Sequence, residues 1–424
     1  MAGMAAANAG GFAVREQSTY WQGSSFAGAA AGGVLSSMFW NPATMTQVPG
    51  IQIETGAAGI IPSATHTVGA GSTFAFLGGA GDSGDDALVP SFYASWQINP
   101  QLWLGLSFNA PFGLSVSFPD AWAGRNYAAN TSLKTYNAAP TIAYQINNVI
   151  SVGAGLQVQF AKADLSSGLP TGLTHQVNIT GDGWGYGFTA GITLTPTPNT
   201  TIGIGYRSAI DQDIEGTMTL PAGVFFVPPF STPGNVNTSL NLPDVVTFGL
   251  RHKFSPQWTA MATVEWSNWS RIGTSNVLQA NGAPATVLLA PVTLPFQYDD
   301  GWFFSLGAEY QWNERLALRA GVGYEKSPIT DLVRTPRLPD NDRTWVSVGA
   351  SYNVTKKLAL DFAYSHLFVK STPINISAAS GNPWFNGVIT YIGDVDSHVD
   401  IVSLSLRYRW DDPPAAPKKM LVTK

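Results

Sequence analysis

Apolar residues occupy every second position in several stretches of this chain. Residues 314–324 show this most clearly, because small or charged residues fill the intervening positions. Successive side chains of a β-strand point to opposite faces, so one face of this segment would be apolar and the other mixed. A single segment also fits a half-buried strand of a soluble protein. Recurrence at transmembrane length, with aromatic ends, is typical of membrane-spanning strands.

This recurring pattern predicts fourteen strands from about residue 50 onwards. They are expected near residues 50–62, 88–98, 101–112, 134–147, 149–163, 182–196, 199–213, 243–254, 257–269, 300–312, 314–326, 342–354, 357–370 and 397–410. An even number suits a closed bacterial barrel, in which every backbone donor and acceptor is paired and no strand edge faces lipid. The predicted fold is therefore an all-β, fourteen-stranded antiparallel transmembrane β-barrel.

The links between the predicted strands alternate strictly between short and long. Short links such as residues 99–100, 147–148 and 255–256 are each followed by a much longer connection at the next strand end. Outer-membrane barrels have tight periplasmic turns and long extracellular loops. With a periplasmic N-terminus, the long connections are expected outside the cell.

The two faces of the predicted strands differ in polarity. Lys or Arg facing lipid at the midplane costs about 2 to 4 kcal/mol, so the charged faces must point into the lumen. The lipid-facing sets are Leu102, Leu104, Leu106 and Phe108; Ile150, Val152, Ala154, Leu156, Val158 and Phe160; Trp302, Phe304, Leu306, Ala308, Tyr310 and Trp312; and Leu358, Leu360, Phe362 and Tyr364. Their alternates include Gln157, Gln159, Glu309, Arg319, Asp361, Arg407 and Arg409. The lumen is therefore expected to be polar and mixed in charge.

Composition supports a barrel over other membrane architectures. Only 12% of the 424 residues are charged, whereas about 25% is usual in soluble domains. No run of about 18 apolar residues offers a transmembrane helix. Cys is absent, which suits passage through an oxidising periplasm. The net charge of -5, without a basic block, argues against nucleic acid as a partner.

The residues do not suggest an enzyme. The five His are scattered, and no Gly-x-Ser-x-Gly or His-Glu-x-x-His motif stands out. We expect no catalytic residues, no metal site and no cofactor. A lipase with a Ser/His pair at the barrel rim is a remote alternative.

The ends of the chain lack the strand pattern. Residues 1–9 fit the remnant of a signal peptide or an expression-derived addition, and residues 411–424 fit a flexible tail. Residues 10–49 could be a disordered leader rich in small residues. However, Phe39, Trp40 and the Asn41-Pro42 turn indicate a compact element, and a fourteen-stranded barrel, spanning residues 50–410, is wide enough to need filling. A plug in the lumen is the preferred interpretation.

Several motifs resemble the FadL family of outer-membrane transporters of long-chain fatty acids and other hydrophobic compounds. They are GGFAVREQS at residues 10–18, Asn41-Pro42-Ala43, GDGWGYG at 181–187, LPD at 242–244, WSNW at 266–269 and LPDNDRTW at 338–345. The resemblance covers nearly the whole barrel. It implies a monomeric barrel, ligand capture outside and lateral release into the membrane. It also implies an N-terminal hatch, for which we nominate Phe12, Phe39, Trp40, Asn41, Pro42 and Ala43.

A lateral exit is expected in the third strand. Pro111 cannot donate a ladder hydrogen bond, and Gly113 permits a bulge or kink. These residues could equally end the strand. Family members kink this strand inward, which favours an opening at Asn109, Pro111, Phe112 and Gly113.

Apolar loop segments are the predicted capture surface, since soluble loops usually avoid such runs. The nominated residues are Val224, Phe225, Phe226, Val227, Phe230, Leu288, Leu289, Trp384 and Phe385. These loops could instead pack on one another as a lid, and both interpretations can hold together.

A ligand with a carboxylate would need a basic partner in the lumen. Arg207, Arg251, Arg319 and Arg407 face inward in the predicted barrel, but Glu265, Glu309 and Asp361 do so too and could pair with them. Structural pairing is the favoured role for most of these arginines.

The sequence thus predicts passive import of hydrophobic molecules by a monomer embedded among lipid and lipopolysaccharide in the bacterial outer membrane. A general porin for polar solutes and a surface adhesin or receptor are the alternatives. The residues do not distinguish fatty acids, alkanes and aromatics as substrates.

Overall fold

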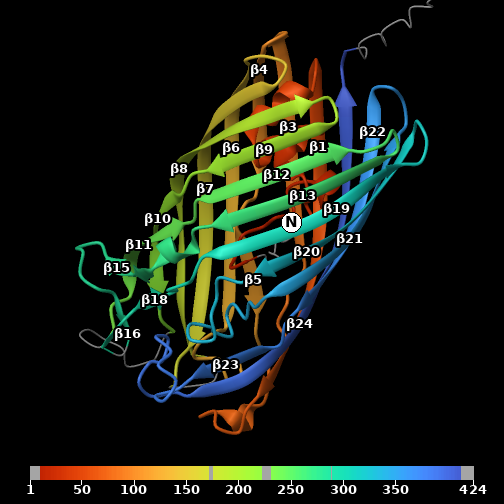
Figure 1. The fold of residues 1–424 in the computed structure, drawn as a ribbon. Coiled ribbons are helices and arrows are strands. Elements are labelled where there is room, and N and C mark those ends of the chain that lie inside the picture. The colour runs from red at the N-terminus through yellow and green to blue at the C-terminus, as the bar shows by residue number, and fades with distance from the viewer. Residues whose placement is uncertain (1–9, 171–174, 222–230, 288, 412–424) are drawn as a thin grey trace, which may run out of the picture.

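The barrel wall consists of fourteen antiparallel strands, as predicted. The computed structural model describes residues 10–170, 175–221, 231–287 and 289–411 (Figure 1). In chain order the wall contains β1 (Ile51–Val68), β3 (Ala87–Asn99), β4 (Leu102–Asn109) continued by β5 (Gly113–Ser117), β6 (Asn130–Gln145), β7 (Ile150–Gly168), β8 (Gln176–Thr197), β9 (Thr200–Arg207) continued by β10 (Ile210–Thr219), β11 (Gly234–Leu242) continued by β12 (Val245–Lys253), β13 (Trp258–Ser267), β19 (Gly301–Gln311), β20 (Leu316–Lys326), β21 (Arg343–Asn353), β22 (Leu358–Val369) and β24 (Tyr391–Arg409). Pairing of β1 with β24 closes the barrel.

Short elements occupy the long connections. β2 (Gly81–Asp82) extends the pairing of β1, and β23 (Thr372–Ile376) pairs with β24. The connection between β13 and β19 contains η5 (Trp269–Ile272), β14 (Thr274–Asn276), β15 (Leu278–Gln279), β16 (Thr286–Val287), β17 (Ala290–Pro291) and β18 (Thr293–Pro295). A further 3-10 helix, η4 (Ala75–Leu77), follows β1. Among the described residues, no helix is long and apolar enough to cross a membrane.

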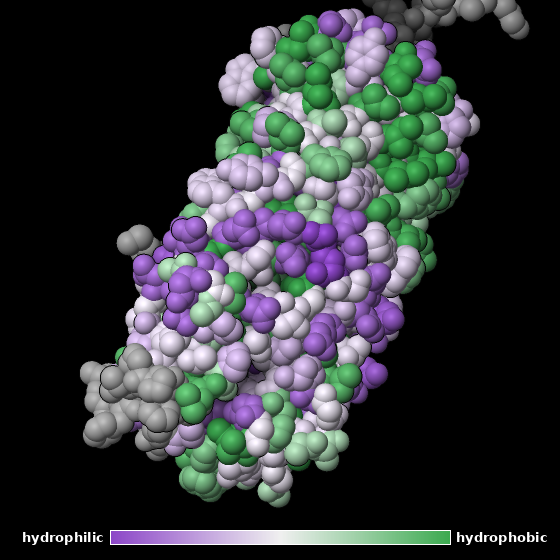
Figure 2. Space-filling view, turned by 90° about the vertical axis from the view of Figure 1, so that its left-hand side faces the viewer, coloured by the Kyte–Doolittle hydropathy of each residue, from purple (hydrophilic) through white to green (hydrophobic). Residues whose placement is uncertain are grey.

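The inward and outward faces of the strands follow the predicted alternation. Leu306 is 65% exposed on the outside, whereas Gln159 is fully buried and Arg319 is 3% exposed on the inside. Figure 2 shows the hydrophobic residues of the outer face concentrated toward one end and bounded by a band of hydrophilic residues. This arrangement suits a lipid-facing belt with a polar extracellular part.

Several strands are longer than the apolar pattern predicted. β8 begins at Gln176 instead of about 182, and β24 begins at Tyr391 instead of about 397. Their additional outward positions are polar, as at Asn178, Thr180 and Asp394. The hydrophobic alternation ends where the strand leaves lipid, although backbone pairing continues beyond that point.

The N-terminal segment lies inside the barrel (Figure 1). It forms α1 (Thr19–Gln22) and the 3-10 helices η1 (Ala29–Ala31), η2 (Leu35–Phe39) and η3 (Pro42–Gln47). These helices contact strands around the barrel, among them β6, β7, β8, β9, β12, β21 and β22. Most residues from 10 to 45 are buried. We call residues 10–49 the hatch.

Candidate functional site

The third wall strand breaks between β4 and β5. β4 pairs with β3 as far as Phe108, opposite Phe92, and with β6 as far as Asn109. β5 then pairs with β6 along its length and forms an isolated bridge from Val116 to Gly84 on its other side, while residues 87–91 of β3 pair with β1 alone. Within the described residues, the wall between β3 and β5 therefore lacks a continuous hydrogen-bonded ladder. Residues 110–112 oppose only two residues of β6, which makes the break a bulge.

The hatch covers this break from inside. The backbone N–H of Val14 donates to the carbonyl of Pro111 over 2.8 Å, and that of Gly113 donates to the carbonyl of Phe12 over 2.8 Å. Gln17 Nε2 donates to the carbonyl of Ala110 over 2.9 Å. Backbone groups that strand β3 leaves unpaired are thus satisfied by the hatch.

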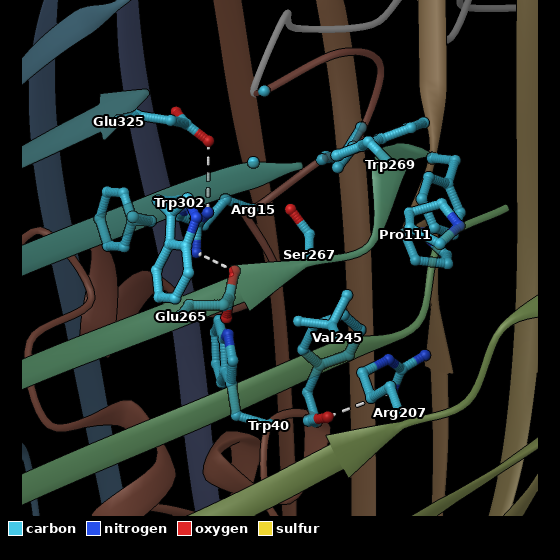
Figure 3. A pocket seen from close by; sticks show the side chains of 18 of the residues that line it. Arg15, Trp40, Pro111, Arg207, Val245, Glu265, Ser267, Trp269, Trp302 and Glu325 are labelled. Carbon is cyan, nitrogen blue, oxygen red and sulfur yellow. Dashed lines mark hydrogen bonds and ion pairs between the residues drawn. The ribbon is translucent and has the colours of Figure 1, made fainter. Parts of the chain in front are cut away.

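A small cavity lies beside the break (Figure 3). We call it the lower cavity; it has a volume of about 70 Å³, and its lining includes Val14, Arg15, Trp40, Pro111 and Arg207. The guanidinium of Arg15 binds Glu265 over 2.7 Å and Glu325 over 3.3 Å. Burial alone would lower the pKa of Arg15, but these two carboxylates raise it. Arg15 therefore fastens the hatch to β13 and β20.

A larger cavity lies on the other side of Phe12. This upper cavity has a volume of about 280 Å³ and is lined largely by apolar residues, among them Leu133, Ala163, Leu165, Val236 and Leu240. Phe12 lines the upper cavity, whereas its neighbours Ala13 and Val14 line the lower one. The Phe12 ring is 2% exposed and packs edge-on against Trp269, with 4.8 Å between ring centroids. Phe12 therefore stands between the two cavities.

The residues nominated for ligand capture do not all lie at the upper cavity. Val224, Phe225, Phe226, Val227, Phe230 and Leu288 lie outside the described residues. Trp384 lines the upper cavity, and Phe385 packs against the buried apolar cluster that includes Phe12 and Leu133. Leu289 is 59% exposed, with a φ of 66°, and is not part of the cavity lining.

The Asn-Pro-Ala element anchors the middle of the hatch. Asn41 caps η3, because its Oδ1 accepts from the backbone N–H of Ala43 over 3.0 Å. Its Nδ2 donates to the carbonyl of Ala30 over 2.8 Å and to that of Ile192 on β8 over 3.0 Å. Pro42 occupies the first turn of η3, where no donor is needed. The nominated Phe39 and Trp40 pack edge-on against each other and both line the lower cavity.

Three of the four nominated head-group arginines are paired with carboxylates. Arg319 binds Glu309 over 2.9 Å, Arg407 binds Asp361 over 2.7 Å, and Arg251 lies 3.7 Å from Glu309. Arg207 instead stacks over the Phe39 ring at 4.1 Å and has no carboxylate partner among the described residues. It lines the lower cavity.

Sequence reasoning missed Arg337, which lies in the connection between β20 and β21. It is 8% exposed and lines the upper cavity. The alternation of the predicted strands identifies inward-facing arginines on strands, whereas Arg337 lies in a loop where no such pattern exists. Its position between Pro336 and Pro339, directly before the LPDNDRTW motif at residues 338–345, is the available signal.

The chain is similar in sequence to known outer-membrane proteins along almost its whole length. Residues 1–410 match the family model described as "Outer membrane protein transport protein (OMPP1/FadL/TodX)". The chain is 26% identical to a long-chain fatty acid transport protein of Escherichia coli O6:H1, covering 84% of this chain and 86% of that protein. It is also 26% identical to outer membrane protein P1 of Haemophilus influenzae strain Rd, with 95% of each covered.

Solved structures show the same fold. A crystal structure of a Pseudomonas aeruginosa FadL homologue has a TM-score of 0.83 at 23% identity, covering 95% of this chain and 100% of that chain. The Pseudomonas putida toluene transporter TodX has a TM-score of 0.66 at 18% identity, covering 89% and 95%. The family match, together with the closed barrel and its internal hatch, shows that this chain is an outer-membrane protein and belongs to the OMPP1/FadL/TodX family of transport proteins.

Proposed function

We propose that the protein imports hydrophobic molecules passively and releases them sideways into the outer membrane. A ligand enters the upper cavity from the extracellular loops, passes Phe12 and leaves between β3 and β5. The observation that carries this proposal is the break in strand pairing at the bulge, which lies beside the lower cavity and is covered from inside by the hatch. Relatives named as transporters of long-chain fatty acids and of toluene support a hydrophobic substrate.

Lateral release has a simple thermodynamic advantage. Each methylene group that stays out of water saves about 0.8 kcal/mol, so an apolar ligand moves more readily into lipid than into the periplasm. A general porin would need a continuous aqueous path, whereas the hatch fills the lumen with buried residues such as Trp21, Asn41 and Met45. We propose further that the protein works as a monomer surrounded by lipid and lipopolysaccharide.

The proposal can be tested by closing the break. Deleting Ala110 removes the additional residue of the bulge, and Pro111→Thr restores a backbone donor at the following position. This variant should pair β5 in register with β4 and abolish most uptake of radiolabelled oleate and toluene by cells that lack their own transporter. Pro140→Thr, at the lipid-facing position of β6 opposite Leu106, is the matched control. Equal uptake by both variants would refute lateral release.

A further inference from the structure

The outward side chains of β6, β7 and β8 are ordered in layers across the three strands. Tyr136, Phe160 and Trp184 stand directly opposite one another in the strand register. Aromatic rings gather at the membrane interface, and apolar residues such as Val158 continue from this row towards the periplasm. Tyr144, near the other end of β6, lies eight residues away, which gives a belt about 21 Å high at about 3.4 Å per residue and a tilt of about 40°. The aromatic row therefore marks the outer edge of the lipid-facing belt.

Two lysines follow this row on its extracellular side. Lys134 of β6 and Lys162 of β7 are direct partners in the register. Their Cβ atoms are thus about 5 Å apart, a position at which like charges destabilise the pairing of two strands. Within the described strands, no other two basic residues stand directly opposite each other. On β24, by contrast, the outward positions beyond the belt include Asp394 and Asp396.

Neither lysine is neutralised by a carboxylate. Among the described residues, neither ammonium forms an ion pair or a hydrogen bond. Asp182 stands opposite Lys162 on β8, and Asp164 follows Lys162 two positions along β7, but neither carboxylate binds an ammonium of the pair. An anion held between the two ammoniums would relieve their repulsion and accept charge-assisted hydrogen bonds from both.

A polar groove opens directly beyond the lysines. It has a volume of about 450 Å³ and is bordered by β5, β6, β7, β8 and β10. Ser132, Asp164 and Thr180 form the next outward row of the register, about 7 Å farther along the strands, and all three line the groove. Except for Val116, every described residue of the lining bears a hydroxyl, amide or carboxyl group. Such groups donate and accept hydrogen bonds, as the hydroxyl groups of a sugar require.

This outward surface borders the break in the wall. Lys134 is the register partner of Gly113, the first residue of β5. The hydroxyl of Thr135, the next residue of β6, accepts from the backbone N–H of Phe112 over 2.9 Å and donates to the carbonyl of Phe112 over 2.7 Å. A molecule held at the lysine pair would therefore stand beside the bulge, on the lipid side of the wall.

We propose that this face binds the phosphorylated glycolipid of the outer leaflet, lipopolysaccharide, at a specific site. Its acyl chains lie against the belt below the aromatic row, one phosphate bridges Lys134 and Lys162, and its sugars occupy the groove. A phospholipid would use the belt and the lysines but leave the groove empty, and free phosphate would use the lysines alone. The inference goes beyond the proposed import, because it depends on the outer-membrane location and not on a transport route.

The test measures binding of fluorescently labelled lipopolysaccharide with core sugars to the purified full chain in phosphatidylcholine nanodiscs. Lys134→Gln combined with Lys162→Gln should weaken binding about tenfold, because two charge-assisted contacts are lost. Dephosphorylated lipopolysaccharide should bind the wild type and this variant equally weakly. In competition, unlabelled lipopolysaccharide should displace the probe from the wild type at a concentration about tenfold lower than phosphatidylglycerol or inorganic phosphate requires.

Lys326→Gln combined with Lys370→Gln is the matched control, since it removes two exposed lysines from the extracellular ends of other strands. It should leave binding unchanged. Equal weakening by both double variants would show an effect of net charge alone and overturn the inference, as would unchanged binding by the variant of Lys134 and Lys162. Displacement by phosphatidylglycerol at the same concentration would reduce the surface to a phospholipid contact and also overturn it. A wild type that binds lipopolysaccharide but takes up no oleate would contradict the proposed import and leave this inference standing.

Discussion

At the scale of single residues, the hatch contains a fully buried carboxyl group, that of Glu16. Both carboxyl oxygens of Glu16 are buried without a hydrogen bond, although Arg15, Glu325 and Arg343 lie near enough to influence it. Burial raises the pKa of Glu16 to about 7. The protonated form is therefore the one that suits the closed hatch, and ionisation near neutral pH favours loosening of this segment.

This leads to a pH-dependent prediction. The pKa of Glu16 is higher in the closed hatch than the value of about 4.3 expected in an exposed chain. Stability of the closed hatch should therefore be complete below about pH 4.3 and fall as the pH rises to about 7. Hydrogen exchange of residues 12–18, corrected for its intrinsic pH dependence, should accelerate across this range. In Glu16→Gln the acceleration should vanish, and an unchanged pH profile would contradict this role.

At the scale of elements, the hatch packs against inward-facing glycines of the wall. A Cβ atom at Gly203 or Gly205 of β9 would overlap the carbonyl oxygens of Ala30 or Trp40. A Cβ at Gly249 of β12 would lie 2.7 Å from the backbone nitrogen of Ala31. Direct contact between two backbones at these positions requires glycine.

Adding methyl groups at this contact should displace the hatch. Gly203→Ala with Gly205→Ala is expected to leave a folded barrel whose hatch is more readily cleaved by added protease and exchanges amide hydrogens faster. Gly59→Ala is the control, because a Cβ there meets only the carbonyl of Val402 at an ordinary 3.7 Å. If the hatch were equally protected from protease and from hydrogen exchange in both variants, β9 would be able to move outward and accommodate the added methyl groups.

The sequence predicted the barrel better than it predicted the site. The alternation of Leu316, Leu318 and Val322 arises because these side chains face lipid. This pattern can be recognised in each strand without knowledge of the rest of the fold. The extracellular end of β8 lacks that signal because Asp182 faces water there. Gly203 and Gly205 lie within the predicted strand at residues 199–213, but their contact with the hatch depends on how residues 10–49 fold inside the lumen. The burial of Arg337 at the upper cavity depends on which loop groups surround it in the folded protein.

At the scale of the whole molecule, the proposed function separates a lateral route from the route along the barrel axis. The proposed lateral route passes through the break between β4 and β5, which residues 12–17 of the hatch cover. The route along the barrel axis is filled by the rest of the hatch, which Asn41 ties to β8 and whose residues Trp21 and Met45 are fully buried. Removal of different parts of the hatch should therefore affect the uptake of a hydrophobic ligand and the conductance of hydrated ions differently.

Two deletions test this separation in planar bilayers. The wild type should carry only small currents, because buried hatch residues such as Trp21 and Met45 occupy the axis. Removal of residues 10–17 should uncover the lateral break and alter oleate uptake, yet add little ionic conductance, since Trp40 and Asn41 still occupy the lumen. Removal of residues 10–49 should produce large steady currents, as expected of a barrel wide enough for an aqueous channel. Large currents in the wild type would favour a porin, and equal currents from both deletions would place the ligand route along the axis.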